Sequence, residues 1–212
     1  MLLLLTAAVV TACYWYVDVP AAKWARYDLP RSVRDVASWV SLLGRADIYL
    51  VPLAIGAVYC GVKRKWWGNP FVMTFAQIAI AGLSSNLFKF ILARNRPNML
   101  HKVGEYGFEW FSADYSQNSF PSGHTTTVAA VVVVLWLWLP RWRVAWVALL
   151  LAVGVSRVLA TAHYPGDVFG GVTLAIVMTF AVQRLFLKMR WITSPPEPPP
   201  ELPPNSPPES SP

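Results

Sequence analysis

Hydrophobic and polar positions follow one another along the chain in long blocks. Six apolar stretches are separated by polar connections, most of them short. A helix needs about 20 mostly apolar residues to cross the hydrocarbon core of a bilayer, and the stretches approach this length. The pattern therefore predicts an all-α protein, a six-helix transmembrane bundle. The predicted spans are residues 1–19, 48–62, 70–92, 122–139, 144–162 and 165–188.

The first connection, residues 20–47, contains a different pattern. Pro30 fits a helix start and Gly44 a helix end. Between them, apolar residues recur at helical spacing while the charged residues fall elsewhere. We expect a short amphipathic helix, either lying at the membrane interface or packed on the bundle as an ordinary loop helix. Its apolar positions are Val33, Val36, Val40 and Leu43.

The last part of the chain has a composition unlike the rest. Residues 192–212 are mostly Pro, Glu and Ser, with almost nothing apolar to bury. Such a segment is expected to be disordered, with polyproline II character. We therefore predict a membrane domain over residues 1–191 and a disordered tail over 192–212. The tail is either simply solvated or binds a protein partner.

Composition and charge support a membrane protein. Hydrophobic residues make up 55% of the chain and charged residues only 14%, with a mean hydropathy of +0.42. The net charge of +7 suits contact with anionic lipid headgroups or an anionic substrate. A nucleic-acid partner is not expected, because the basic residues lie at the edges of apolar stretches and form no single patch.

Three polar stretches interrupt this apolar pattern. Residues 89–97 close the third predicted span, residues 121–124 open the fourth, and residues 156–167 join the fifth and sixth. With six spans, all three fall on the same face of the membrane. Ionisable groups at membrane depth are costly and usually functional. We therefore expect the three stretches to form one site.

The first two stretches have features of an anion site. Lys89 and Arg96 are seven residues apart, so on a continuing helix both point the same way, about 10 Å apart. Snorkelling of these cations into lipid headgroups is the alternative. Ser122 suits a helix cap and Gly123 lets the backbone approach a ligand, so the helix N-terminus can bind an anion. His124 follows in the first turn.

The third stretch carries a histidine and a carboxylate. His163 and Asp167 are four residues apart, and Pro165 between them fits the first turn of the sixth span. A carboxylate at that turn can orient the imidazole and make its other nitrogen a better nucleophile. Arg157 adds a third strong cation to the set.

A metal site is the obvious alternative, because histidine and aspartate are common ligands. The three stretches contain only three such ligands, however, and the neighbouring cations would repel a metal ion. The same cations would stabilise the negative charge of a phosphoryl group in transfer. The pattern thus predicts a phosphate site without a metal.

Taken together, the three stretches resemble the signature of the type 2 phosphatidic acid phosphatase superfamily. The resemblance covers about residues 87–167, and the six-helix layout extends it over nearly the whole chain except the tail. The matching positions are Lys89-x6-Arg96-Pro97, Pro121-Ser122-Gly123-His124 and Ser156-Arg157-x5-His163-x3-Asp167.

The resemblance implies a role for each position. His163 would be the nucleophile that forms a phosphohistidine, Asp167 the carboxylate that orients it, and His124 the general acid. No metal or other cofactor is implied. Arg94 is expected to be a solvated cation, with a place in the pocket as the alternative. The implied phosphate pocket is Lys89, Arg96, Ser122, Gly123 and Arg157.

The implied activity is hydrolysis of a membrane lipid phosphate or diphosphate. Candidate substrates are undecaprenyl diphosphate, phosphatidylglycerol phosphate, phosphatidic acid and lipid A phosphates, and the compact layout favours an envelope lipid such as undecaprenyl diphosphate. The alternatives are a vanadate-dependent haloperoxidase-like enzyme, whose known members are soluble, and a non-catalytic lipid-binding scaffold.

Orientation is less well determined, because Lys and Arg are divided evenly between the two faces. The positive-inside rule is strongest for short turns, and the turns opposite the site are the short basic ones. Bacterial members of the superfamily place the site at the outer face of the cytoplasmic membrane. We therefore expect a multi-pass inner-membrane protein with its site on the periplasmic face and its C-terminus in the cytoplasm.

Overall fold

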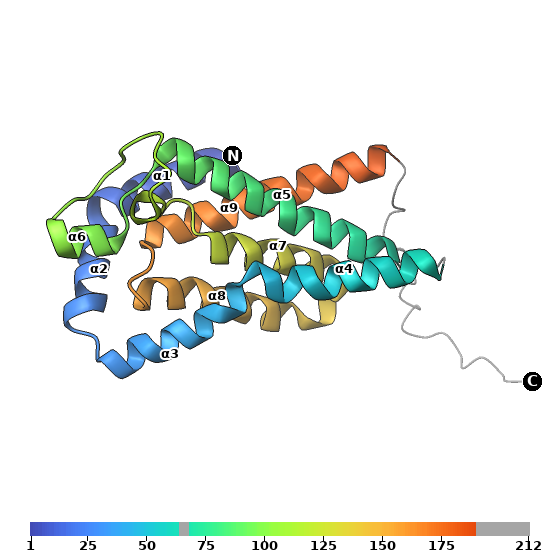
Figure 1. Ribbon diagram of the computed structural model, residues 1–212, viewed down its shortest axis with the longest axis horizontal. Helices are drawn as coiled ribbons and strands as arrows, with labels where there is room; N and C mark the ends of the chain where they lie inside the picture. Colours follow the sequence, from blue (N-terminus) through green and yellow to red (C-terminus); the bar gives the residue numbers. More distant parts are fainter. Residues whose placement is uncertain (64–67, 190–212) are drawn as a thin grey trace, which may run out of the picture.

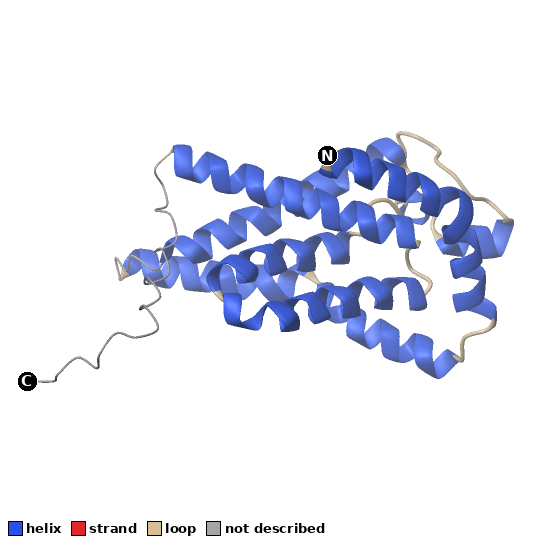
Figure 2. Cartoon of the chain, turned by 180° about the vertical axis from the view of Figure 1, so that it is seen from behind, coloured by secondary structure: helices blue, strands red, loops and turns tan. Residues whose placement is uncertain are grey.

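The computed structural model describes residues 1–63 and 68–189. Within these residues the chain is helical and contains no β-strand; an isolated bridge joins Arg94 to Phe108. Figures 1 and 2 show the elongated bundle from two sides. The predicted all-α fold is confirmed, while the predicted tail, 192–212, lies outside the described residues. The α-helices are α1 (Leu2–Ala12), α2 (Asp18–Tyr27), α3 (Arg31–Ser41), α4 (Ala46–Val62), α5 (Gly68–Leu92), α6 (Pro97–Val103), α7 (Gly123–Trp138), α8 (Arg143–Leu159) and α9 (Pro165–Lys188).

The bundle matches a membrane protein in length and composition. Five helical segments of the described chain are long and apolar enough to span a bilayer, and the sixth predicted span is the shorter helix α7. They are Leu2–Tyr27, Arg31–Val62, Phe71–Leu92, Pro140–Leu159 and Pro165–Lys188.

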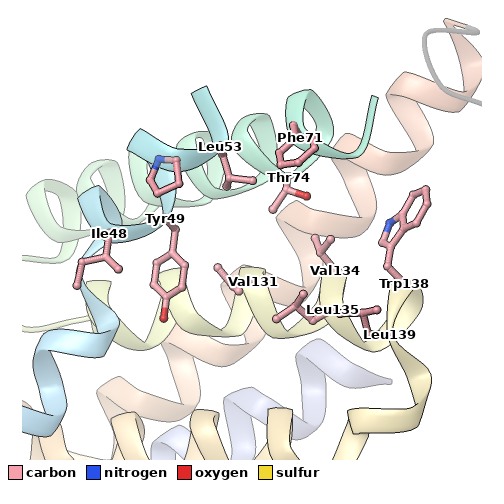
Figure 3. Close-up of a pocket in the computed structure, with 11 residues that line it drawn as sticks. Ile48, Tyr49, Leu53, Phe71, Thr74, Val131, Val134, Leu135, Trp138 and Leu139 are labelled. Carbon is pink, nitrogen blue, oxygen red and sulfur yellow. The ribbon is translucent and has the colours of Figure 1, made fainter. Parts of the chain in front are cut away.

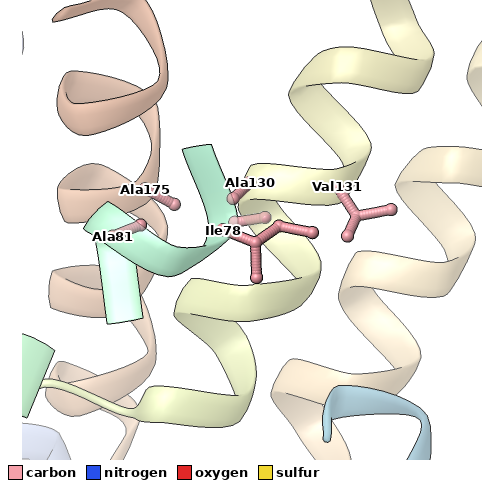
Figure 4. Close-up of a cluster of buried hydrophobic side chains, with 6 residues drawn as sticks. Ile78, Ala81, Ala130, Val131 and Ala175 are labelled. Carbon is pink, nitrogen blue, oxygen red and sulfur yellow. The ribbon is translucent and has the colours of Figure 1, made fainter. Parts of the chain in front are cut away.

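Helix α7 is the core of the bundle. It packs against α5, α8 and α9, and the side chains from Thr125 to Val132 are all buried. Small residues allow this close approach: Ala81 of α5, Ala130 of α7 and Ala175 of α9 meet around Ile78 in one cluster (Figure 4). The helix that opens with the predicted Ser-Gly-His stretch is therefore held on all sides.

The N-terminal segment is longer than the predicted span of residues 1–19. Helix α1 lies along α9, where the Thr6 and Thr173 hydroxyls are 2.8 Å apart. A π-helical turn, Cys13–Val17, then leads into α2, which crosses one end of the bundle (Figure 1). The polar connection thus begins near Asp28. The consequence is that Asp18, at the start of α2, is carried into that end of the bundle.

The predicted amphipathic helix is present with nearly the predicted bounds. Helix α3 has Pro30 as its N-cap residue and is followed by a 3₁₀ turn, Leu42–Gly44. It packs along α8 and buries Ala37 and Ser41 on that side, while Trp39 is 73% exposed. The structure therefore shows the packed arrangement, with an apolar face left on the outside.

Candidate active site at one end of the bundle

The three predicted stretches meet at the end of the bundle that α2 crosses. The C-terminal ends of α5 and α8 and the N-terminal ends of α7 and α9 all lie there (Figure 1). Helix ends place side chains precisely, because the helices themselves are fixed by packing. Lys89 comes from α5, His124 from α7, Arg157 from α8 and Asp167 from α9.

The histidine and carboxylate of the third stretch are in contact. The His163 Nδ1 and Asp167 Oδ2 atoms are 3.4 Å apart, and both side chains are buried. The Tyr164 backbone N–H also donates to Asp167 Oδ2, at 2.9 Å, which completes a capping box at the start of α9. The carboxylate is thus fixed by the helix that carries it. Its contact with Nδ1 leaves Nε2 of His163 as the nitrogen that can face a ligand.

The protonation state of His163 follows from this environment. Burial lowers the pKa of His163 to about 3, although the contact with Asp167 opposes the shift. The nearby charges of Arg157 and Arg96 act in the same direction as burial. The imidazole is therefore neutral near pH 7, which is the form that can act as a nucleophile.

Lys89, Arg96 and Arg157 are cations without a carboxylate partner among the described ion pairs. Lys89 Nζ and Arg96 Nη2 both donate to the Asn118 carbonyl, at 3.3 and 3.2 Å. Arg157 Nη1 donates to Ser41 Oγ at 3.0 Å. The positive charges of Arg96 and Arg157 both act on Lys89, and that of Arg96 acts on Arg157. Three adjacent uncompensated positive charges attract an anion to this point.

The start of α7 lies beside these cations. Ser122 is the N-cap residue, and its backbone N–H donates to the Asp167 carbonyl at 3.0 Å, which ties α7 to α9. A Cβ added to Gly123 would lie 3.7 Å from Lys89 Nζ. The first N–H groups of a helix have no partner within the helix, so this end adds partial positive charge to the three cations.

His124 is positioned by a close backbone approach. A Cβ added to Gly44 would come within 2.6 Å of His124 Cβ, so position 44 requires glycine. His124 lies within electrostatic range of Arg157, Lys89 and Arg96. The structure therefore brings together all eight residues singled out in the sequence.

Arg94 corrects the sequence-based interpretation. It was expected to be a solvated cation, and it is fully buried. Its Nη1 donates to Asp167 Oδ1 and its Nη2 to Asp18 Oδ2, both at 2.6 Å. Burial alone would lower the pKa of Arg94, but Asp167 and Asp18 outweigh it and raise the pKa. Arg94 thus holds the carboxylate that contacts His163.

Aromatic rings enclose this arginine. The rings of Tyr14, Tyr106, Phe108 and Tyr164 lie with their centroids 4.6–5.5 Å from its Cζ atom, which favours a desolvated guanidinium. The Tyr106 hydroxyl accepts from Arg94 Nη2 at 2.9 Å and donates to the Tyr14 carbonyl at 2.8 Å. Two aromatic residues of the loop after α6, Tyr106 and Phe108, therefore belong to the Arg94 environment.

Two further contributors were not found from the sequence. Ser119 Oγ donates to Asp167 Oδ2 at 2.5 Å and lies 3.5 Å from His163 Nδ1. Asp18 Oδ1 accepts from the Gly166 backbone N–H at 2.9 Å. A signal existed for Asp18, which is the single acidic residue in the first apolar stretch. Nothing in the sequence distinguishes Ser119 from other loop serines.

The donor set around the site suits an anion. Within residues 1–63 and 68–189, no group of three or more His, Cys, Asp or Glu side chains comes together that could hold a metal ion. Asp167 has its oxygens engaged by Arg94, Ser119 and the Tyr164 N–H. The groups that remain available are positively charged or are hydrogen-bond donors.

Comparisons with known proteins identify relatives of this chain. The family model of the PAP2 superfamily matches residues 71–191. A lipid A 1-phosphatase of Rhizobium etli is 42% identical over 97 residues, which are 46% of this chain and 42% of that protein, so the match spans less than half of the relative's length. Phosphatidylglycerophosphatase B of Bacillus subtilis is 28% identical over 195 residues, covering 85% of this chain and 89% of its own.

The fold is also known from a solved structure. The crystal structure of a transmembrane PAP2-type phosphatidylglycerolphosphate phosphatase from Bacillus subtilis superimposes with a TM-score of 0.60 at 21% identity, covering 89% of this chain and 95% of that one. The matched region contains all three polar stretches of the site. The chain belongs to the PAP2 superfamily.

Proposed function

We propose that this protein is an integral membrane phosphatase that hydrolyses a lipid phosphate or diphosphate through a phosphohistidine intermediate. The observation that carries the proposal is a neutral, buried His163 fixed by Asp167 beside three cations that have no carboxylate partner. A nucleophile and a positively charged pocket for the phosphate are the two things that phosphoryl transfer requires.

In the first step, Nε2 of His163 attacks the phosphorus atom, and the bond between phosphorus and the lipid oxygen breaks. Asp167 stabilises the positive charge that develops on the ring through its contact with Nδ1, at 3.4 Å. His124 enters this step protonated and gives its proton to the leaving oxygen. The products are phosphohistidine and the dephosphorylated lipid.

In the second step, water attacks the phosphohistidine. His124, now neutral, takes the proton from the water, and the bond between phosphorus and Nε2 breaks to release inorganic phosphate. Lys89, Arg96 and Arg157 stabilise the charge on the phosphoryl oxygens in both steps, together with the N-terminus of α7. Preorganised charge of this kind does the work that a metal ion does in other phosphatases, so we propose a metal-independent reaction.

Two relatives support a lipid substrate and a membrane setting. One is a lipid A 1-phosphatase and another a phosphatidylglycerophosphatase. Helix α9 runs from the site to the opposite end of the bundle (Figure 1), so its C-terminal end lies on the other face. We propose that the site faces the outside of the cytoplasmic membrane and that the C-terminus faces the cytoplasm.

The test is phosphate release by the purified protein in detergent, with EDTA present, across a panel of lipid phosphates and diphosphates. His163→Ala is expected to abolish release. His101→Ala is the matched control, because His101 lies on α6 outside the eight site residues and its replacement should leave release unchanged. Brief incubation with ³²P-labelled substrate should trap an acid-labile, alkali-stable phosphoprotein in the wild type and none in His163→Ala.

Each contrary result has a clear meaning. Loss of activity in EDTA would overturn the metal-independent reaction, and activity that survives His163→Ala would overturn the intermediate. Vanadate, a phosphate analogue, should inhibit release by occupying the positive pocket. Halide oxidation that depends on added vanadate would instead favour the haloperoxidase-like alternative.

A further inference from the structure

A second cavity lies next to His124. It has a volume of about 340 Å³ and is formed by the start of α4 together with α5 and α7. This size lies within the range of small-molecule sites, roughly 300–1,000 Å³. Its polar lining residues are Arg45, Asp47, Ser85, Asn86, His124 and Thr127.

The cavity differs from the phosphate pocket in its charge. Arg45 and Asp47 form a close pair, with Nη2 donating to Oδ2 at 2.7 Å and Nε to Oδ1 at 3.0 Å. The positive charge is therefore already balanced within the cavity wall. A second phosphate placed beside this pair would meet the carboxylate of Asp47, which is unfavourable. The cavity suits a neutral group.

The lining nevertheless offers hydrogen bonds. Ser85 is 1% exposed, and its Oγ has no hydrogen-bond partner anywhere in the described chain. A buried hydroxyl without a partner is costly, so this atom indicates a ligand that donates or accepts there. The amide of Asn86 and the hydroxyl of Thr127 line the same space. A leaving group with several hydroxyl or amide groups would satisfy them.

An apolar groove continues along the same three helices. It has a volume of about 530 Å³ and is lined by Ile48, Leu53, Val131 and Leu135 among others (Figure 3). Ile48 directly follows Asp47 of the polar cavity on α4. Helices α4, α5 and α7 thus line two spaces in succession. The polar cavity lies beside His124, and the apolar groove lies farther along α7. This order matches a lipid with a polar neutral group between its phosphate and its hydrocarbon chain.

We infer that the cavity binds the leaving group of the substrate, and that this group is a neutral, hydroxyl- or amide-bearing unit such as a sugar or glycerol. The inference rests on the proposed function, because it places the scissile oxygen beside His124 between the two pockets. It predicts a preference for a phosphomonoester carried on a sugar or glycerol over an isoprenyl diphosphate, whose leaving group carries a second phosphate.

Two pairs of variants test the cavity. Ser85→Ala removes the unpartnered hydroxyl, and Ser84→Ala on the adjacent face of α5 is its control. Gly82→Leu fills the cavity, because nothing lies within 4 Å of a Cβ added at position 82. Gly61→Leu on α4 is its control, because position 61 is equally open but does not line the cavity.

The variants are compared with the wild type on four substrates: a glucosamine 1-phosphate lipid, lysophosphatidic acid, an isoprenyl diphosphate and p-nitrophenyl phosphate. Ser85→Ala should lower kcat/KM for the first two by about three- to tenfold, the usual effect of one lost hydrogen bond. Gly82→Leu should lower it by more than about tenfold, because the leaving group no longer fits. Turnover of p-nitrophenyl phosphate, whose leaving group has no alcohol hydroxyl or amide, should stay near wild type in Ser85→Ala and in the two control variants.

The outcomes separate the two proposals. A higher kcat/KM for the isoprenyl diphosphate, or equal effects of Ser85→Ala and Ser84→Ala, would overturn the leaving-group inference while leaving the phosphatase intact. If p-nitrophenyl phosphate turnover survives His163→Ala, the proposed function itself fails. Ser85→Ala should lower kcat/KM more for one of the two lipids, the sugar phosphate or the glycerol phosphate. The lipid with the larger loss carries the group that the cavity binds.

Discussion

Arg94 and Arg96 are two residues apart, both buried, and have opposite electrostatic surroundings. Arg94 contacts two carboxylates, Asp167 and Asp18, each at 2.6 Å. Arg96 donates to backbone carbonyls, at 2.9 Å for Tyr115 and 3.2 Å for Asn118. One charge is balanced inside the protein and the other is not. A cation that lacks an internal carboxylate partner is available to bind a substrate anion, whereas a paired cation stabilises the folded protein.

The backbone explains why neighbouring arginines diverge. Arg94 pairs with Phe108 in an isolated bridge, and Arg96 is extended, with φ −74° and ψ 159°. Asn95 between them donates its backbone N–H to the Gly107 carbonyl and its side chain to Glu109 Oε1, at 3.0 Å. The hydrogen bonds with the loop after α6 hold this segment, so the two guanidinium groups stay in separate environments.

The largest expected effect comes from removing the balanced charge. Arg94→Met leaves Asp18 and Asp167 buried without their cation, which typically destabilises a protein by about 3–5 kcal/mol. Unfolding in detergent, followed by helical circular dichroism, should show this loss. Arg96→Met is the control and should destabilise less, because the loss of its hydrogen bonds to the Tyr115 and Asn118 carbonyls is offset by the removal of a buried charge without a carboxylate partner. Equal destabilisation by the two substitutions would contradict the comparison.

The unbalanced charge should matter for catalysis instead. Arg96→Met is expected to lower kcat/KM about 100- to 1,000-fold, the usual effect of removing one group that stabilises transition-state charge. Vanadate inhibition should weaken in parallel. Lys102→Met, an exposed cation on α6, is the matched control and should leave both values near wild type. A normal vanadate affinity in Arg96→Met would remove Arg96 from the phosphate pocket.

The second carboxylate on Arg94 offers a smaller perturbation. Asp18→Asn keeps the shape and an acceptor for the Gly166 N–H but removes the charge. Arg94 retains Asp167, so we expect a loss of about 1–3 kcal/mol in unfolding free energy, as for one charge-assisted hydrogen bond. The exposed residue Asp28 supplies the control, Asp28→Asn, which should be neutral. A loss in Asp18→Asn as large as in Arg94→Met would mean that Asp18 alone sets the stability of the network.

The same comparison shows what the sequence could reveal. The apolar stretches predicted the bundle, because each helix carries its own hydrophobic pattern. The eight predicted site residues come together because they occur in short runs at helix ends, where spacing along the chain fixes spacing in space. His163 and Asp167 are four residues apart across the start of α9, and Ser122, Gly123 and His124 are consecutive.

What was missed depends on contacts between distant parts of the chain. Arg94 is paired with Asp18, 76 residues away, and Asp167 with Ser119, 48 residues away. The loop that holds Ser119 has no periodic pattern from which a fold could be inferred. Arg94 and Arg96 are chemically identical in the sequence, and only the tertiary fold decides which of them meets a carboxylate.

The smallest expected effect concerns the fall of phosphoenzyme formation at acidic pH. Burial, together with Arg157 and Arg96, lowers the pKa of His163 to about 3 from an ordinary value of 6.5, against the opposing effect of Asp167. Formation of the phosphoenzyme should therefore persist down to about pH 4 and fall as the pH passes through the folded pKa. Unfolded His163 takes up its proton near pH 6.5, so its contribution to stability is complete above that value and is lost as the pH drops towards 3.

Arg96→Met removes one of the charges that lower this pKa, so the acid limb of phosphoenzyme formation should move to higher pH. Burial is the largest cause of the shift, and it remains in the variant, so the limb should move by less than about one pH unit. Rapid-quench measurement of labelled phosphoenzyme between pH 3 and 7 would detect the change, with Lys102→Met as the control. If the pH dependence of phosphoenzyme formation is unchanged, the charge of Arg96 does not affect the pKa of His163. Arg96 would then act on the substrate phosphate alone.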